Sequence, residues 1–88
     1  MPHMLAKLRG IKAEVIKGIL KADAGMHARE GFRLEHLWQN VDDPDEVLFL
    51  FEVEDLNHAK EFIDYAHAQS REVDPTGKLP TMTFLEEK

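Results

Sequence analysis

The spacing of apolar residues changes along the chain and marks out alternating strands and helices. Apolar and polar positions alternate in residues 4–11, which is the period of a strand. In residues 12–29 the apolar positions recur at i, i+3, i+4 and i+7, and this spacing predicts an amphipathic helix. Gly31 stands just beyond it, where a helix commonly ends in a residue with positive φ. Glycine within the helical pattern, at Gly18 and Gly25, predicts either close packing or an irregularity near Gly25.

The middle of the chain predicts a β-hairpin. Residues 32–41 alternate again, and an Asp-Asp-Pro-Asp turn follows at residues 42–45. Residues 46–54, EVLFLFEVE, have the strongest strand character in the chain. Odd-numbered and even-numbered positions of this strand are both apolar at its centre. A sheet with helices on one side only should be polar on its other face, so the second face needs a cover.

One more helix and one more strand complete the pattern. Asp55 is a suitable N-cap, and the apolar stripe that follows predicts a helix that ends before the Asp-Pro-Thr-Gly segment at residues 74–77. Residues 79–86 predict a short terminal strand. The order β-α-β-β-α-β predicts an α+β, ferredoxin-like fold, with a four-stranded antiparallel sheet and two helices on one face.

Size and composition favour one domain, residues 1–88, that gains from association. A chain of 88 residues buries only a little over ~60% of its unfolded surface, so oligomerisation is a reasonable source of further stability. The absence of cysteine excludes disulfides and thiolate metal sites, and we expect a cytoplasmic protein. No stretch has the length and apolarity of a membrane span or signal peptide, and we expect no membrane partner.

Charge is divided unevenly along the chain. Residues 1–34 carry seven Lys or Arg and three acids, whereas the other 54 residues carry four and fourteen. The net charge of −6 disfavours binding of nucleic acid through its phosphates. We interpret the division as two segments that pack with complementary charge.

Two runs of sequence resemble a known superfamily. HLWQNVDDPDEVLFLFEVEDLNHAKEFI, residues 36–63, and LPTMTFLEE, residues 79–87, are similar to small bacterial proteins of the dimeric α+β barrel superfamily, which includes antibiotic biosynthesis monooxygenase-like domains. The resemblance implies a homodimer in which two four-stranded sheets face each other as a barrel, with the helices outside. It also implies a ligand cleft between the sheet and helices of each subunit.

Several aromatic and imidazole side chains are candidates for such a cleft. Because residues of one parity share a strand face, Phe32, Leu34, His36 and Trp38 should line the same surface. The candidate ligand-binding residues are Trp38, Phe49, Phe51, Tyr65 and His27. His36 is the candidate catalytic base, since burial among aromatic rings would keep its imidazole neutral.

Other chemistry has little support. The five histidines form no HxH or HxxxH pair, and Asp64 with His67, like Asp55 with His58, is better explained by helix-surface pairing or capping, so we expect no metal and no cofactor. Serine-hydrolase and nucleotide-binding motifs are absent. The leading hypothesis is a homodimer that binds a small, mostly apolar or aromatic molecule. A cofactor-independent monooxygenase or isomerase/cyclase, and a structural or stress-associated dimer without a ligand, remain alternatives.

Overall fold

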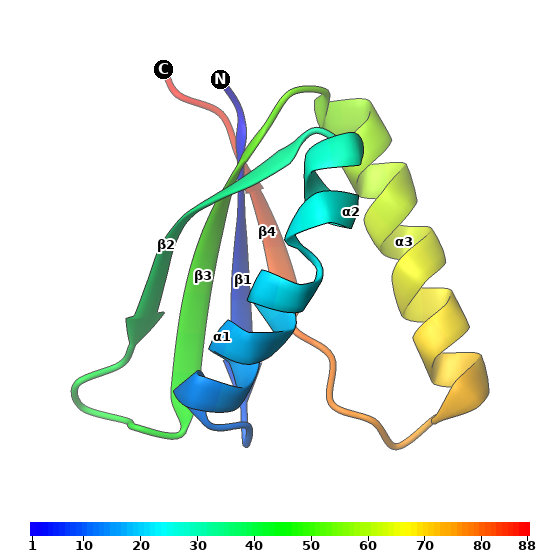
Figure 1. Ribbon diagram of the computed structural model, residues 1–88. Helices are drawn as coiled ribbons and strands as arrows, with labels where there is room; N and C mark the ends of the chain where they lie inside the picture. The colour runs from blue at the N-terminus through cyan, green and yellow to red at the C-terminus, as the bar shows by residue number, and fades with distance from the viewer.

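Four antiparallel strands form one sheet in the computed structural model, which describes all residues 1–88 (Figure 1). The strands are β1 (His3–Arg9), β2 (Phe32–Gln39), β3 (Glu46–Val53) and β4 (Thr81–Leu85). Their order across the sheet is β2-β3-β1-β4, so the first and third strands lie at the centre. This order confirms the ferredoxin-like α+β fold that the sequence predicts.

Three helices connect the strands, one more than the sequence pattern indicates. They are α1 (Ala13–Ala22), α2 (Ala24–Arg29) and α3 (Leu56–Val73). The single helix expected over residues 12–29 is broken at Asp23, whose backbone, at φ −91° and ψ 1°, leaves helical geometry. The irregularity expected near Gly25 is therefore confirmed, two residues earlier in the chain.

Two local signals for helix ends act as the sequence predicts. Asp55 caps α3, and its carboxylate accepts a hydrogen bond of 3.2 Å from the backbone N–H of His58. Gly31 follows α2 with φ +82°, a conformation that costs a residue with a side chain about 1–2 kcal/mol. Its carbonyl then accepts a hydrogen bond of 3.0 Å from the N–H of Glu54, which fixes the entry into β2.

The core lies between the sheet and the helices. Eleven residues are buried and all are apolar: Met4, Ala6, Leu8, Ile16, Leu20, Phe32, Val47, Phe49, Phe51, Val53 and Ala59. Every second residue of β1 and β3 contributes, and the register places these residues opposite each other, as in the pair Met4 and Phe51. Burying a side chain the size of Phe51 contributes roughly 1.5–3 kcal/mol. A core of eleven residues is nevertheless small, and stability is correspondingly limited.

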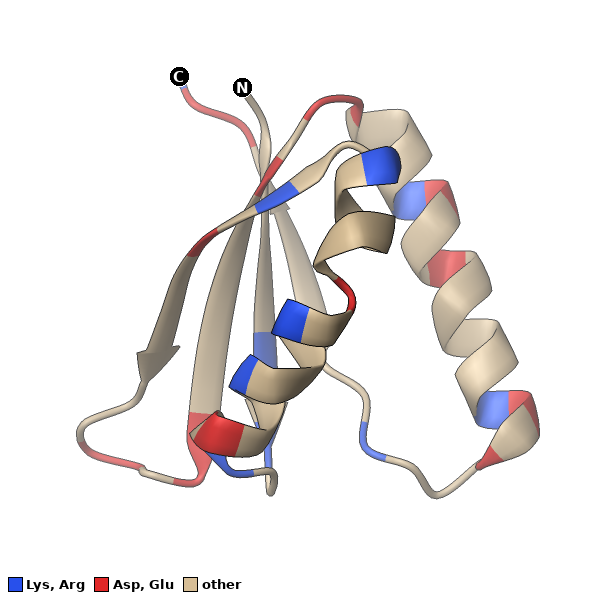
Figure 2. Cartoon of the chain, viewed as in Figure 1, with Lys and Arg blue, Asp and Glu red and all other residues tan.

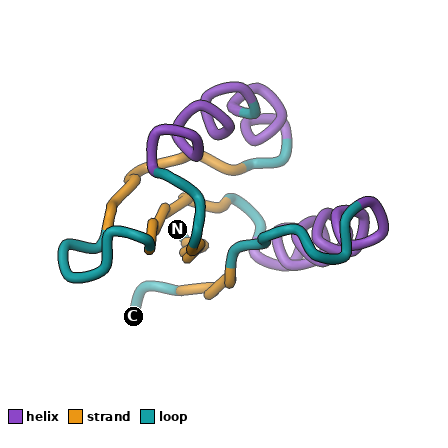
Figure 3. Tube along the Cα trace, turned by 90° about the horizontal axis from the view of Figure 1, so that it is seen from below, coloured by secondary structure: helices purple, strands orange, loops and turns teal.

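All helices pack on this core, so the opposite side of the sheet has no helix over it (Figures 1 and 3). We call that side the open face. Three residues occupy its middle on the central strands, Leu5 from β1 with Leu48 and Leu50 from β3, all partly exposed. Charged residues lie toward both ends, among them Arg9 and Glu52. No helix of the structure is long and apolar enough to cross a membrane.

Candidate functional site

A β-bulge in the edge strand β2 decides which side chains can meet. The pairing of β2 with β3 shifts register between Leu34 and His36, so Glu35 is an extra residue without a partner. After the bulge, the odd-numbered and even-numbered residues of β2 therefore exchange faces of the sheet. Phe32 and Leu34 share the helix side with Val53 and Phe51, as expected from alternation.

The bulge overturns the expected surroundings of His36 and Trp38. His36 pairs with Leu50 and Trp38 with Leu48, so both lie on the open face and not beside Phe49 and Phe51. Their rings stack with centroids 4.8 Å apart, and Trp38 is 46% exposed. The expectation that His36 is buried among aromatic rings is therefore wrong, because one extra residue in the strand turns the imidazole to the other face.

The helix side of β2 borders a cleft of about 450 Å3 under α1 and α2. Its apolar lining is Leu20, Ala24, Ala28, Phe32, Leu34 and Leu37. The volume falls within the range of ~300–1,000 Å3 that is usual for small-molecule sites. We call this hollow the ligand cleft; it lies between sheet and helices, where the resemblance implied one.

His27 is the one imidazole in the ligand cleft. Its ring lies edge-to-face on Phe51, with centroids 5.1 Å apart and planes at 72°, and 6.3 Å from the ring of Phe32. Burial lowers the pKa of His27, and the nearby carboxylate of Asp23 opposes the shift only in part. The imidazole is therefore neutral at neutral pH and can accept a proton. The contact with aromatic rings that the sequence predicted for His36 is therefore found at His27.

Three basic residues complete the lining of the ligand cleft, but the side chain of one of them, Arg33, turns to the open face. Lys17 and Lys21 are one helical turn apart on α1, and Arg33 comes from β2. Figure 2 shows Lys or Arg positions in blue on both α1 and β2. No acidic residue lines the cleft, although the chain carries a net charge of −6. Arg33 also pairs with Glu52 at 3.1 Å, whereas neither lysine forms an ion pair. The sequence analysis did not single out Lys17 and Lys21, although their i, i+4 spacing places them on the same side of a helix.

The other candidates are divided between core and surface. Phe49 and Phe51 are buried in the core below the cleft, where Phe49 contacts Phe51 with centroids 5.9 Å apart. Tyr65 lies on α3 with 65% of its surface exposed and is not part of the cleft lining. Of the residues singled out from the sequence, the structure thus places His27, Phe32 and Leu34 on the wall of the ligand cleft and Phe51 against the His27 ring.

A second hollow of about 470 Å3 lies beside the loop after β1. Its walls mix both signs of charge, with Lys7 and Arg9 opposite Asp45 and Glu46. The Lys78 ammonium donates a hydrogen bond of 3.0 Å to the carbonyl of Gly10 at its rim. Because its polar groups already pair within the chain, this hollow has less to offer a ligand than the ligand cleft.

Comparison with known proteins supports the fold. A crystal structure of an antibiotic biosynthesis monooxygenase-like protein from Deinococcus radiodurans superposes with a TM-score of 0.63 at 14% sequence identity, covering 100% of this chain and 93% of the other. No family model matches the sequence, and no curated protein does. The chain therefore has the ferredoxin-like α+β fold of that protein over its whole length.

Proposed function

We propose that this protein binds a small molecule with an apolar body and an anionic group in the ligand cleft. The observation that carries the proposal is the composition of the wall, which has six apolar residues, Lys17, Lys21, Arg33, His27 and no carboxylate. An apolar ligand body would be driven in by burial at about 25 cal/mol per Å2. Two lysines without ion-pair partners would attract its anionic group and orient the ligand.

The exposed lysines of the ligand cleft favour a ligand with an anionic group over a purely apolar one. Leu20 and Phe32 of the lining are buried, whereas Lys17 and Lys21 are exposed on α1. A ligand would therefore have to keep its charged end toward solvent and its apolar end toward Phe32. Aromatic or aliphatic carboxylates and phenolates of modest size have this shape and charge.

A second candidate function is cofactor-independent catalysis on the bound molecule, namely monooxygenation, isomerisation or cyclisation. In the monooxygenation, dioxygen would give one oxygen atom to the bound molecule and lose the other as water, with the electrons and protons supplied by that same molecule. One observation favours such catalysis. His27 is a half-buried imidazole whose lowered pKa leaves it able to take a proton from a bound ligand at neutral pH. The name of the Deinococcus radiodurans protein adds weak support, since the two chains share a fold at 14% identity.

We also propose that two copies of the chain associate through their open faces. Leucines at the centre of that face, flanked by charged residues at both ends, match the usual interface pattern of apolar core and polar rim. Both signs of charge are present, for example Arg9 and Glu52, so a two-fold arrangement can pair unlike charges. The small core adds a reason for association. We further propose a cytoplasmic location for this cysteine-free chain.

A pair of dyes tests the ligand class. The anionic dye 8-anilinonaphthalene-1-sulfonate and its uncharged relative N-phenyl-1-naphthylamine have nearly the same apolar body. We expect both to bind with a fluorescence increase. The double variant Lys17→Gln/Lys21→Gln should weaken binding of the sulfonate dye about five- to tenfold and leave the uncharged dye unaffected, because two partly screened charges are lost.

Matched variants locate the binding. Lys12→Gln/Lys88→Gln removes the same charge away from the cleft and should change neither titration. Ala28→Trp, which fills the cleft, should abolish binding of both dyes, whereas Ala68→Trp on the exposed side of α3 should not. If Ala28→Trp binds both dyes like the wild type, the cleft is not the site, and the protein is better explained as a structural dimer. If both lysine variants behave alike, the anionic part of the proposal is wrong.

A further inference from the structure

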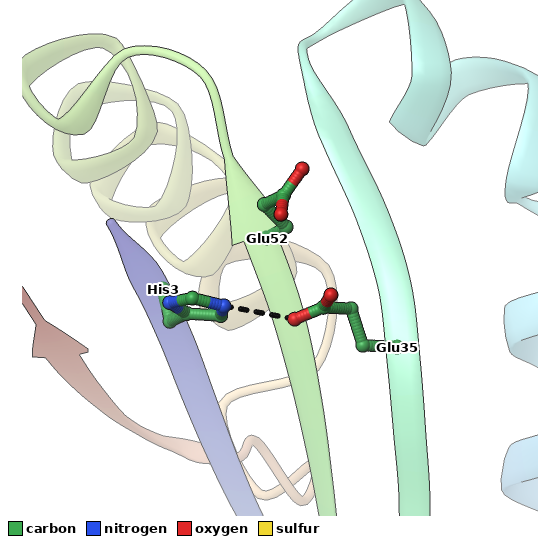
Figure 4. A group of neighbouring side chains, drawn as sticks. All are labelled: His3, Glu35 and Glu52. Atoms are coloured by element: carbon green, nitrogen blue, oxygen red, sulfur yellow. Dashed lines mark hydrogen bonds and ion pairs between the residues drawn. The ribbon is translucent and has the colours of Figure 1, made fainter. Parts of the chain in front are cut away.

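Three side chains from three different strands meet at one end of the open face (Figure 4). They are His3 of β1, Glu35 of β2 and Glu52 of β3, and their ligand atoms all lie within 4.8 Å of one another. His3 Nε2 is 2.8 Å from Glu35 Oε1. Thirty-two residues separate these two in the sequence, so no spacing rule points to them.

Glu35 enters this group from the β-bulge. It is the unpaired residue of the bulge, and its carboxylate lies on the open face, as alternation from Phe32 and Leu34 predicts, while the bulge places His36 on that face as well. Bulges commonly re-aim a side chain next to a functional site. His3 and Glu52 lie on the same face, because the register places them directly opposite each other on neighbouring strands.

The backbone around the group is well anchored. His3 pairs with Glu52 on one side and with Leu85 of β4 on the other. The ladder continues past His3, because the N–H of Val53 donates a hydrogen bond of 2.9 Å to the carbonyl of Pro2. Ligands on paired strands hold a site more accurately than ligands on loops.

We propose that His3, Glu35 and Glu52 bind a divalent first-row transition metal ion. One imidazole and two carboxylates are a set of donors that such ions accept at about 2.0–2.2 Å, and three protein ligands leave a position for water or another small ligand. The imidazole favours zinc, cobalt or nickel over magnesium and calcium, which prefer oxygen ligands alone. All three side chains are about three-quarters buried, with side-chain exposures of 24–26%.

Arg33 would compete with a metal ion for the carboxylates of Glu35 and Glu52. Its Nη2 lies 3.1 Å from Glu52 Oε1 and 3.7 Å from Glu35 Oε2. The group thus holds two carboxylates and a single guanidinium. The Arg33 side chain is 71% exposed and can move into solvent when a divalent ion takes its place.

Equilibrium dialysis with Zn²⁺, together with Co²⁺ absorption spectra, tests the site on protein without an added histidine tag. We expect one ion per chain and no comparable binding of Mg²⁺. His3→Gln, Glu35→Gln and Glu52→Gln should each weaken Zn²⁺ binding at least about tenfold, because loss of even an outer-shell partner has effects of ~10–100-fold. Circular dichroism checks that these near-isosteric variants are folded.

His58 provides a matched control. Its Nε2 lies 2.6 Å from Glu30 Oε2, an exposed histidine–glutamate pair without a second carboxylate. His58→Gln should leave Zn²⁺ affinity unchanged, and Arg33→Gln should raise it. The proposal is overturned if the His3 and Glu52 variants bind Zn²⁺ like the wild type, if His58→Gln loses as much, if Arg33→Gln binds more weakly, or if Mg²⁺ binds equally well.

Discussion

The imidazole of His27 rests edge-to-face on the ring of Phe51, with centroids 5.1 Å apart and planes at 72°. This contact joins the short helix α2 to the central strand β3. It takes one side of the imidazole out of water while the other side lines the ligand cleft. One residue thus contributes to stability and to the wall of the candidate site, and its protonation should affect both.

The stability of the protein should fall as the pH falls below neutral. Burial lowers the pKa of His27 from its usual value of 6.5, so between the folded and unfolded pKa values the unfolded chain binds more protons. The contribution is therefore complete above about pH 6.5 and is lost as the pH falls toward the lower folded pKa. Thermal melts followed by circular dichroism between about pH 7.5 and pH 5 measure the loss.

Two variants assign that pH dependence. The pKa of His67 is also lowered, chiefly by burial and then by the nearby Arg71, so it contributes with the same sign. His27→Phe should melt with a weaker pH dependence than the wild type, and His27→Phe/His67→Gln should show the weakest. An unchanged pH slope in the double variant would contradict the assignment.

Two glycines should respond to alanine in opposite directions. Gly31 has φ +82°, and a Cβ there would lie 3.2 Å from the carboxylate of Glu54, so Gly31→Ala should destabilise by about 1–2 kcal/mol. Gly18 lies in α1 with nothing within 4 Å of an added Cβ, so Gly18→Ala should stabilise by about 0.5–1 kcal/mol. Urea denaturation of the two variants measures both changes, and the same sign for both would be the contradicting result.

The N-cap of α3 can be tested in the same way. Asp55→Ala removes the acceptor for the His58 N–H, and we expect a loss of about 1 kcal/mol in the free energy of unfolding. Glu61→Ala, on the exposed side of the same helix, removes a carboxylate that makes no hydrogen bond and should change stability by less than about 0.5 kcal/mol. Equal losses for the two variants would show that the cap is not the cause.

Association through the open face predicts a mass and a way to disrupt it. Light scattering during size-exclusion chromatography should give about twice the chain mass of 10.1 kDa. Leu50→Glu places a charge at the centre of the open face and should give the monomer mass at low micromolar concentration, because an unpaired charge would be buried. Val73→Glu, at a site 87% exposed at the end of α3, should leave the mass unchanged. A folded wild-type monomer would refute the dimer.

His36 and His27 can be compared directly by ligand binding. Because the bulge turns His36 to the open face, His36→Ala should leave the binding of 8-anilinonaphthalene-1-sulfonate within about twofold of wild type. His27→Ala removes part of the cleft wall and should weaken it several-fold. A stronger effect of His36→Ala than of His27→Ala would favour His36, as the sequence did, as the histidine that acts on the ligand.

Local sequence signals predicted most of the fold because they act over short distances. The alternation in β1 and β3, the Asp55 cap and the positive φ at Gly31 all depend on neighbouring residues. The break at Asp23 was anticipated only as an irregularity, because a two-residue difference in position depends on how α1 and α2 pack against the sheet.

The candidate sites were less accessible to sequence reasoning, and the bulge at Glu35 is the main cause. Strand parity assumes unbroken pairing, so one extra residue moved His36 and Trp38 away from Phe51. Glu35 meets His3 through the pairing of distant strands, a contact across 32 residues that no periodicity encodes.

The sequence by itself determined the order of strands and helices, the apolar stripes and the excess of apolar residues on β3, because these follow from local spacing and composition. Only the tertiary structure decided which face each side chain of β2 occupies, that His27 and not His36 lines the ligand cleft, and that His3, Glu35 and Glu52 meet. The physical reason is that strand pairing and helix docking are contacts between distant segments, and a single shift in their register rearranges every side chain that follows.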